Sequence, residues 1–138
     1  MGYTHYWRRH PDAGKSGRAS YPEAIECVLH LLNDSRVKAL IVNDSDASNI
    51  SFNGVNALAH KDFIIPTELT HIPDFSFCKT ACKPYDVVVV AVLATIADFA
   101  PHSLLVTSDG VPKEWADGCE LASEIFGCHI PVPPDVHP

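Results

Sequence analysis

The sequence predicts one α+β domain with a small, mostly antiparallel sheet and about three helices, one of them central and buried. Its 138 residues suit a single hydrophobic core. Apolar residues make up 46% of the chain and charged residues 20%, the balance of globular rather than disordered proteins. Short segments rich in β-branched and aromatic residues occur together with longer segments of helical pattern. We expect the domain to span 1–130, followed by an irregular, proline-rich tail at 131–138.

The first part of the chain is expected to form a strand and then a helix. Gly2 to Trp7 is dense in aromatic and β-branched residues, which favours a strand. Arg8 to Ala19 has no periodicity and is expected to be an exposed, mobile connection. Ser20-Tyr-Pro-Glu23 has the arrangement of a capping box, so a helix is predicted to begin there and to end near Asn33.

The middle of the chain is expected to contain four short strands. Ala39 to Val42 and Ile50 to Asn53 flank a turn-rich segment, which predicts a hairpin. Phe63 to Pro66 and Asp74 to Cys78 contain or follow a proline, which suits edge strands.

The segment between Pro84 and Pro101 is the predicted central helix. Four consecutive valines favour a strand, but the length and the placement of Pro84 and Asp86 favour a helix. Apolar residues on nearly every face predict that this helix is buried. Leu104 to Thr107 is the last predicted strand, and a final helix is predicted from Pro112 to a stop at Gly127.

Composition argues against several classes of partner. No apolar run follows the start of the chain, and the longest apolar stretch, Val87 to Ala97, is too short to cross a bilayer. We therefore expect a protein of the cytoplasm, which is the cytoplasm of the host cell if the protein is viral. We expect no membrane partner. A net charge of −7 disfavours long nucleic acids, whereas a small anion needs only a local group of donors.

The cysteines give no sign of a disulfide framework or a metal site. Five cysteines are an odd number in a chain large enough to fold without crosslinks, which predicts free thiols. Cys78 and Cys82 are too loosely spaced for a zinc knuckle, and Cys128-His129 lies in no recognisable one. We predict no metal and no cofactor.

The predicted start of the central helix is the strongest candidate for chemistry. Unpaired amides at such a start attract anions, and Lys79, Thr80 and Lys83 would complete an anion site with Tyr85 beside them. The alternative is structural: Thr80 caps the backbone, the lysines are solvated, and Asp86 offsets the helix dipole.

Two other segments supply candidate ligand contacts. His5, Tyr6 and Trp7 combine a titratable group with stacking surfaces, as nucleobase sites do, although such strands more often build core. Ser108 and Asp109 follow a strand, and Asp109 has the chemistry of an acid, a base or a hydrogen-bond acceptor. Ser108 to Gly110 also reads as a tight turn, and Asn53 reads as a turn residue before a polar contact.

The segments Met1 to Trp7, Phe52 to Gly54, Phe77 to Asp86 and Ser108 to Gly110 carry a resemblance that spans nearly the whole chain. The chain resembles a family of small uncharacterised proteins of phages, bacteria and archaea. The resemblance implies a setting in which small proteins act on, or sequester, host molecules such as nucleotide signals. Cys82 departs from the arginine expected in that family, which removes a cation from the anion site.

Three functions are therefore carried forward. The first is a binding module that holds a phosphorylated or nucleotide-like ligand at the cationic helix start. Both a monomer and a homo-oligomer are compatible with this function. The second is a small enzyme in which His5 or Asp109 is the acid or base and Lys83 stabilises negative charge. The third is a protein-interaction module that blocks a host factor.

Overall fold

Two antiparallel three-stranded sheets and four α-helices make up residues 3–137, the part of the chain that the computed structural model describes. The fold class is confirmed as α+β, with two sheets where one was predicted. The elements in chain order are β1 (Thr4–Arg9), α1 (Lys15–Leu32), α2 (Ser35–Lys38), β2 (Ile41–Asn43), β3 (Asn49–Gly54), the 3₁₀ turn η1 (Asn56–Leu58), β4 (Phe63–Pro66), the 3₁₀ turn η2 (Leu69–His71), β5 (Ser76–Lys79), α3 (Asp86–Phe99), β6 (Leu104–Ser108) and α4 (Pro112–Phe126).

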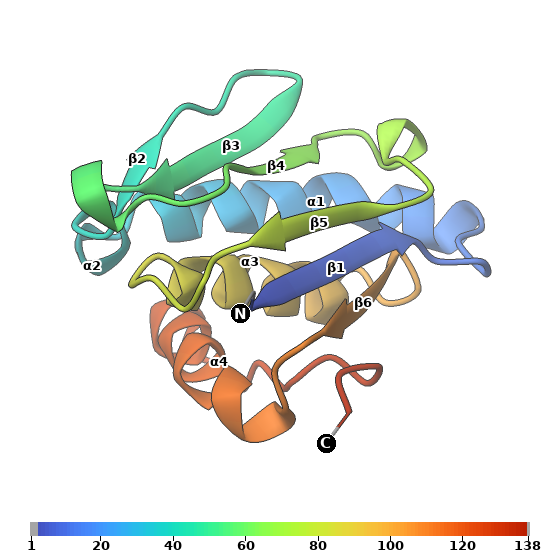
Figure 1. Cartoon of the computed structure of the whole chain (residues 1–138). Helices are drawn as coiled ribbons and strands as arrows, with labels where there is room; N and C mark the ends of the chain where they lie inside the picture. Colours follow the sequence, from blue (N-terminus) through green and yellow to red (C-terminus); the bar gives the residue numbers. More distant parts are fainter. Residues whose placement is uncertain (1–2, 138) are drawn as a thin grey trace.

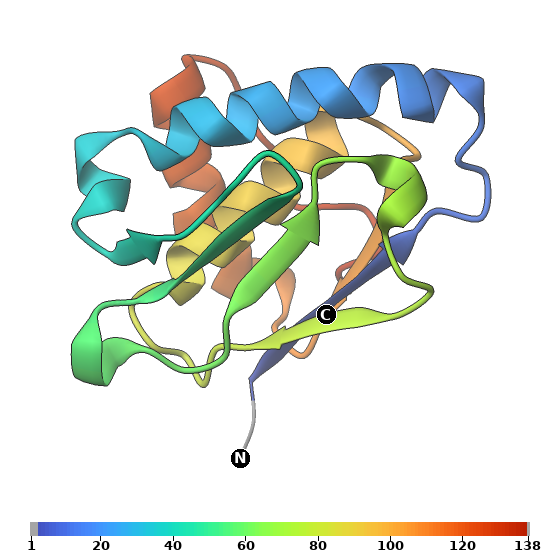
Figure 2. The same ribbon diagram turned by 90° about the horizontal axis from the view of Figure 1, so that it is seen from above.

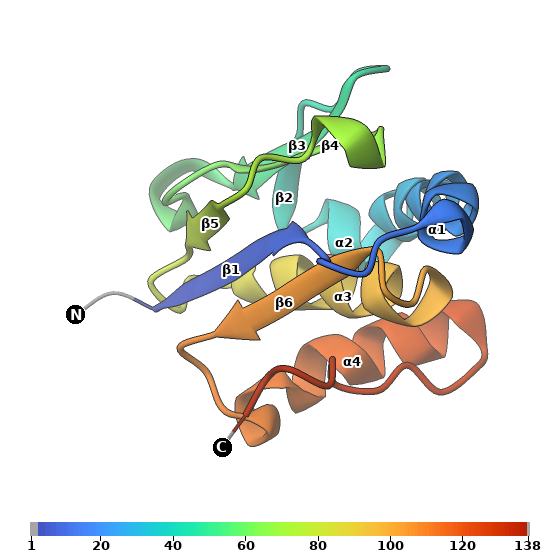
Figure 3. The same cartoon turned by 90° about the vertical axis from the view of Figure 1, so that its right-hand side faces the viewer.

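The sheets have the strand orders β2-β3-β4 and β5-β1-β6, and the edge strands β4 and β5 lie side by side (Figures 1 and 2). The Lys61 amide donates to the Lys79 carbonyl at 3.3 Å beside this seam. The helices cover one face of the strands, with α3 between α1 and α4 (Figure 3). β1 is the central strand of its sheet, and its residues His5 to Trp7 are paired with both β5 and β6.

The central, buried helix is confirmed. Every residue of α3 from Val88 to Ile96 is buried, and the four valines lie in the helix rather than in a sheet. The predicted hairpin is present as β2 and β3, and the two proline-linked strands are edge strands. α4 ends at Gly127, which adopts φ +67° in the left-handed region.

Gly118 allows α4 to pack closely on α3. A Cβ atom at this position would lie 2.7 Å from Val90 Cβ and 2.9 Å from the Val87 carbonyl oxygen. Alanine normally stabilises a helix relative to glycine, but here overpacking outweighs that gain. We expect Gly118→Ala to lower the free energy of unfolding in urea by about 2 kcal/mol. Gly14→Ala is the control, because an added Cβ there meets only the Asp12 carbonyl oxygen, at 3.8 Å. A loss of unfolding free energy in Gly14→Ala as large as that in Gly118→Ala would contradict the prediction.

The start of α1 was predicted wrongly. The helix begins at Lys15, with Gly14 as a cap that makes no side-chain hydrogen bond, and Ser20 to Glu23 lie within it. Residues 15–19 contain no proline, so nothing stops the helix from extending backwards from the expected start. The connection after β1 is therefore short. α2 was also missed, because Asn33 caps the end of one helix and Asp34 immediately caps the next by accepting the Arg36 amide at 2.9 Å.

Residues 131–137 contain no helix or strand, but they are not detached from the domain. Val136 is buried within the core, and Val132 packs against it. None of the helices in the described part of the chain has the length and apolar character needed to span a bilayer.

Candidate functional site

Three element ends meet at one edge of the fold: the start of β1, the end of β6 and the amino end of α3 (Figure 1). The register of β1 brings this about, because His5 lies opposite Ser108 of β6 and Cys78 of β5. The side chain of His5 points to the helix side of the sheet and is fully buried. It is the centre of the candidate site.

A chain of hydrogen bonds runs from Ser108 through His5 to Asp86. The Ser108 Oγ lies 2.7 Å from His5 Nδ1, and His5 Nε2 lies 2.6 Å from Asp86 Oδ1. The Thr80 hydroxyl donates to the same Asp86 oxygen at 2.6 Å. His5 is buried, the Asp86 side chain is 17% exposed and Ser108 is half-buried. The two outer members of this hydrogen-bond series, Ser108 and Asp86, therefore approach solvent.

The partners determine where the protons lie. Asp86 Oδ1 receives the Thr80 hydroxyl proton and faces His5 Nε2, which makes the carboxylate an acceptor and Nε2 the donor. In the neutral imidazole the other nitrogen, Nδ1, is then an acceptor. Ser108 Oγ accepts the Gly110 amide at 2.8 Å, so its own hydrogen is directed to Nδ1. A hydroxyl, a base and an orienting carboxylate are thus connected in the order required to activate a nucleophile.

A strained turn holds Thr80 and Asp86 in place. The Lys83 amide donates to the Thr80 carbonyl at 3.0 Å, and the two residues between them, Ala81 and Cys82, have φ of +52° and +57°. Positive φ at both central positions is the geometry of a type I′ turn, which asparagine and glycine normally supply. Left-handed backbone costs an L-residue roughly 1–2 kcal/mol, and such outliers gather at functional sites.

Aromatic rings enclose the imidazole. The rings of Tyr3 and Trp115 meet His5 edge-on, with centroids 5.1 and 5.2 Å away. Trp115 is fully buried, and its indole nitrogen has no hydrogen-bond partner among the residues that the structure describes. These rings exclude water from the imidazole and fix its plane.

The surroundings of the site are acidic. Burial and the negative charges of Asp86, Glu114 and Asp109 raise the pKa of Tyr3 above its usual range. Burial, Asp86 and Glu114 also raise the pKa of the exposed Cys82 thiol. A further negative charge is therefore disfavoured beside Tyr3 and Cys82.

The electrostatic effect on Cys82 is directly measurable. The thiolate is the reactive form, so a raised pKa slows alkylation at a given pH. Glu114→Gln removes one of the charges that raise it, and we expect faster alkylation of Cys82 by iodoacetamide at neutral pH. Cys128 is exposed at the far end of α4 and provides the internal control. A parallel acceleration of both thiols, or none at Cys82, would contradict this electrostatic assignment.

The structure brings some of the predicted site residues together. His5, Thr80 and Ser108 share one hydrogen-bonded cluster. Tyr6 and Asp109 form its outer rim, where the Tyr6 hydroxyl donates to Asp109 Oδ1 at 3.1 Å. The second carboxylate oxygen of Asp109 accepts the Thr4 amide, also at 3.1 Å.

Three other predicted ligand contacts have structural roles. Trp7 is 2% exposed and packs on Phe63 in the core, 5.0 Å between ring centroids. The buried Tyr85 donates its hydroxyl to the Lys61 carbonyl at 2.6 Å. The side-chain amide of Asn53 donates to the His60 carbonyl and to Asp62, and its oxygen accepts the backbone amides of Gly54 and His60. Both polar atoms of this side chain are therefore hydrogen-bonded within one loop.

A carboxylate of the protein itself takes the place of the predicted anion. The Asp86 carboxylate lies at the first turn of α3, and Thr80, which was expected to bind the anion, is buried and donates to it. The amides of Thr80 and Ala81 both donate to the Tyr3 carbonyl, at 3.0 and 3.3 Å. Lys79 and Lys83 make no ion pair with the described residues, but an anion between them would face Asp86. The geometry favours the structural alternative for this helix start.

Asp86 is the functional residue that sequence reasoning missed. It was taken as a compensating charge for the helix dipole, whereas it orients a histidine that lies 81 positions earlier. Its place directly after Pro84 and Tyr85, at a helix start beside a strand end, was the available signal. The partner itself follows from the sheet register, which one sequence does not show.

Comparison with known proteins adds no further constraint. No protein-family model, curated protein or solved structure matches the chain. The family resemblance noted above therefore stays a prediction. Within residues 3–137 no three His, Cys, Asp or Glu side chains are grouped so as to hold a metal ion, and all five cysteines are free.

Proposed function

We propose that this protein is a small enzyme of the hydrolase type, with Ser108 as nucleophile, His5 as general base and Asp86 as a positioning residue. The observation that carries the proposal is the Ser108–His5–Asp86 chain, with contacts of 2.7 and 2.6 Å. Nucleophile, base and orienting group within hydrogen-bond reach are the signature of an activated hydroxyl. Such constellations recur on unrelated folds and are identified by geometry rather than by chain order.

The reaction follows from the proton positions. Ser108 Oγ attacks an acyl carbon, and its hydrogen passes to His5 Nδ1. His5 then returns that proton to the leaving oxygen, which departs as an alcohol. Water enters, gives a proton to His5 and releases the carboxylic acid, while Ser108 regains its hydrogen. Asp86 stays ionised throughout and stabilises the imidazolium that forms between the steps.

The surroundings favour a neutral acyl ester as the substrate class. Asp86 closes the hydrogen-bond chain and Asp109 directly follows Ser108, so a phosphate next to the reacting atom would be close to these carboxylates. Lys83 lies on the turn that leads into Asp86 and is half-buried without an ion-pair partner among the described residues. It lies at the Asp86 end of the hydrogen-bond chain, across the imidazole from Ser108, so it adds positive charge near the site without contacting the reacting atom.

A fluorophosphonate probe tests the proposal, because it reacts with activated serines and is read by the mass of the modified peptide. We expect a covalent adduct on Ser108 and hydrolysis of p-nitrophenyl acetate that is lost in Ser108→Ala. Ser45 is the matched control: it is half-buried, accepts the Ser51 amide at 2.9 Å and has no histidine beside it. Equal modification of the two serines, or none at Ser108, would show that the cluster only stabilises the fold.

A further inference from the structure

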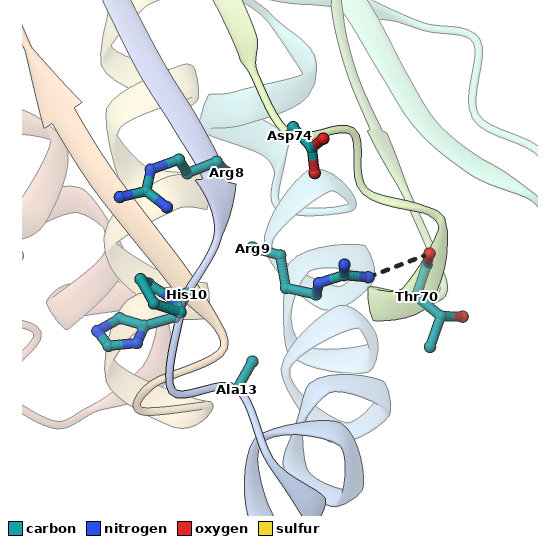
Figure 4. Close-up of a pocket in the computed structure, with 7 residues that line it drawn as sticks. Arg8, Arg9, His10, Ala13, Thr70 and Asp74 are labelled. Atoms are coloured by element: carbon teal, nitrogen blue, oxygen red, sulfur yellow. Dashed lines mark hydrogen bonds between the residues drawn. The ribbon is translucent and has the colours of Figure 1, made fainter.

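A hollow lies at the opposite end of β1 from His5 and Ser108. It has a volume of about 590 Å³ and is lined by Arg8, Arg9, His10, Pro11, Ala13, Thr70 and Asp74. Figure 4 shows Arg9 extended towards the Thr70 carbonyl and Arg8 leaving the strand on the other side, with Asp74 on the facing loop. None of these residues takes part in the His5 cluster.

The two arginines in this hollow are largely uncommitted. Arg9 makes one long contact, 3.5 Å, with the Thr70 carbonyl, and Arg8 has no hydrogen-bond or ion-pair partner within residues 3–137. β5 pairs with β1 only from Thr4 to Trp7, so Arg8 and Arg9 are paired with β6 alone and also protect the free side of the strand there. In a chain of net charge −7, the three consecutive basic residues Arg8 to His10 also gather positive charge at this one hollow.

An aromatic groove adjoins the basic hollow, and Arg8 lines both. The groove has a volume of about 140 Å³ and is lined by Tyr6, Trp7, Arg8, Phe75, Leu105 and Thr107. Phe75 is 62% exposed, and its ring centroid lies 5.9 Å from that of Tyr6. An exposed ring next to a guanidinium is the arrangement on which nucleobases stack beside their phosphates.

We infer that this surface binds a free nucleoside monophosphate, with the base on Phe75 and Tyr6 and the phosphate in the hollow that Arg8 and Arg9 line. Guanidinium groups are the preferred protein partners of phosphate. The basic hollow alone is of the size of small-ligand sites, and the groove adds a flat, apolar extension. A longer nucleic acid is disfavoured because the rest of the chain is acidic.

Asp74 makes the inference sharply testable. Its carboxylate lines the same hollow and forms no ion pair there, so it opposes a bound phosphate. Asp74→Asn is therefore expected to tighten binding, whereas Arg9→Gln and Phe75→Ala each weaken it. A substitution that strengthens binding by removing one carboxylate distinguishes a phosphate site from a surface that binds nonspecifically.

The experiment is a calorimetric titration of the full chain with AMP, adenosine and inorganic phosphate. We expect AMP to bind most tightly, with Kd raised about tenfold by Arg9→Gln or Phe75→Ala and lowered by Asp74→Asn. Arg36→Gln is the matched control, because Arg36 is an exposed arginine already paired with Asp34 and Glu124.

Absence of saturable AMP binding would overturn the inference, as would equal affinities for AMP, adenosine and phosphate. Binding that is unchanged by both Arg9→Gln and Phe75→Ala would overturn it too, and so would tighter binding of a 5′-phosphorylated oligonucleotide than of AMP. The residues changed in this experiment, Arg9, Asp74 and Phe75, lie outside the His5 cluster, so the result is independent of the reactivity of Ser108.

Discussion

Replacing Asp86 by asparagine is expected to slow the reaction of Ser108 with a fluorophosphonate on the order of 100-fold, the scale of general-base catalysis. Asparagine keeps an oxygen that accepts from both Thr80 and His5, whose donors lie 2.6 Å away. What it removes is the negative charge that stabilises the imidazolium formed when Ser108 loses its proton. The fold should therefore persist while reactivity falls.

Rate and stability are separable in this variant. The free energy of unfolding in urea should change by a far smaller factor in Asp86→Asn than the rate of Ser108 labelling does. Asp62→Asn supplies a matched control, since Asp62 also accepts a side-chain hydrogen bond, from Asn53 at 2.7 Å, but outside the cluster. Equal labelling rates in the wild type and in Asp86→Asn would leave the carboxylate with a structural role only.

His5→Ala is expected to give the second large effect, a loss of about 3 kcal/mol in the free energy of unfolding. The side chain is fully buried between Tyr3 and Trp115, so its removal leaves a cavity. Asp86 and Ser108 also lose a partner each. His71→Ala is the control, because His71 is exposed and pairs only with Glu68 at 3.4 Å.

The same variant separates chemistry from packing. Imidazole added to folded His5→Ala should restore part of the reactivity of Ser108 by occupying the cavity, a rescue that a purely structural histidine would not show. Imidazole that stabilises the variant without restoring labelling would argue against the general-base role of His5.

Local sequence patterns sufficed for much of the fold. The central helix could be predicted because Pro84, Asp86 and a long apolar run agree on one element, and α3 begins at Asp86. The start of α1 could not, because the residues of a capping box are equally compatible with a helix interior when the preceding residues also allow a helix.

The site was only half visible in the sequence. His5, Thr80 and Ser108 stood out by residue type, but what joins them is Asp86, through contacts that span 81 and 6 positions. Trp7 and Tyr85 looked like ligand contacts because aromatic residues serve cores and binding sites alike, and burial decides between the two. The register of β1 against β6, which sets His5 opposite Ser108, depends on the whole sheet.

The tautomer of His5 is the feature on which the proposed chemistry depends most directly. ¹⁵N NMR of the imidazole at mildly alkaline pH measures it without a substrate. The account predicts a proton on Nε2, held by Asp86, and a free lone pair on Nδ1 that accepts the Ser108 hydroxyl. A neutral ring with its proton on Nδ1 would mean that Ser108 is an acceptor there and has no base to activate it, which would contradict the account.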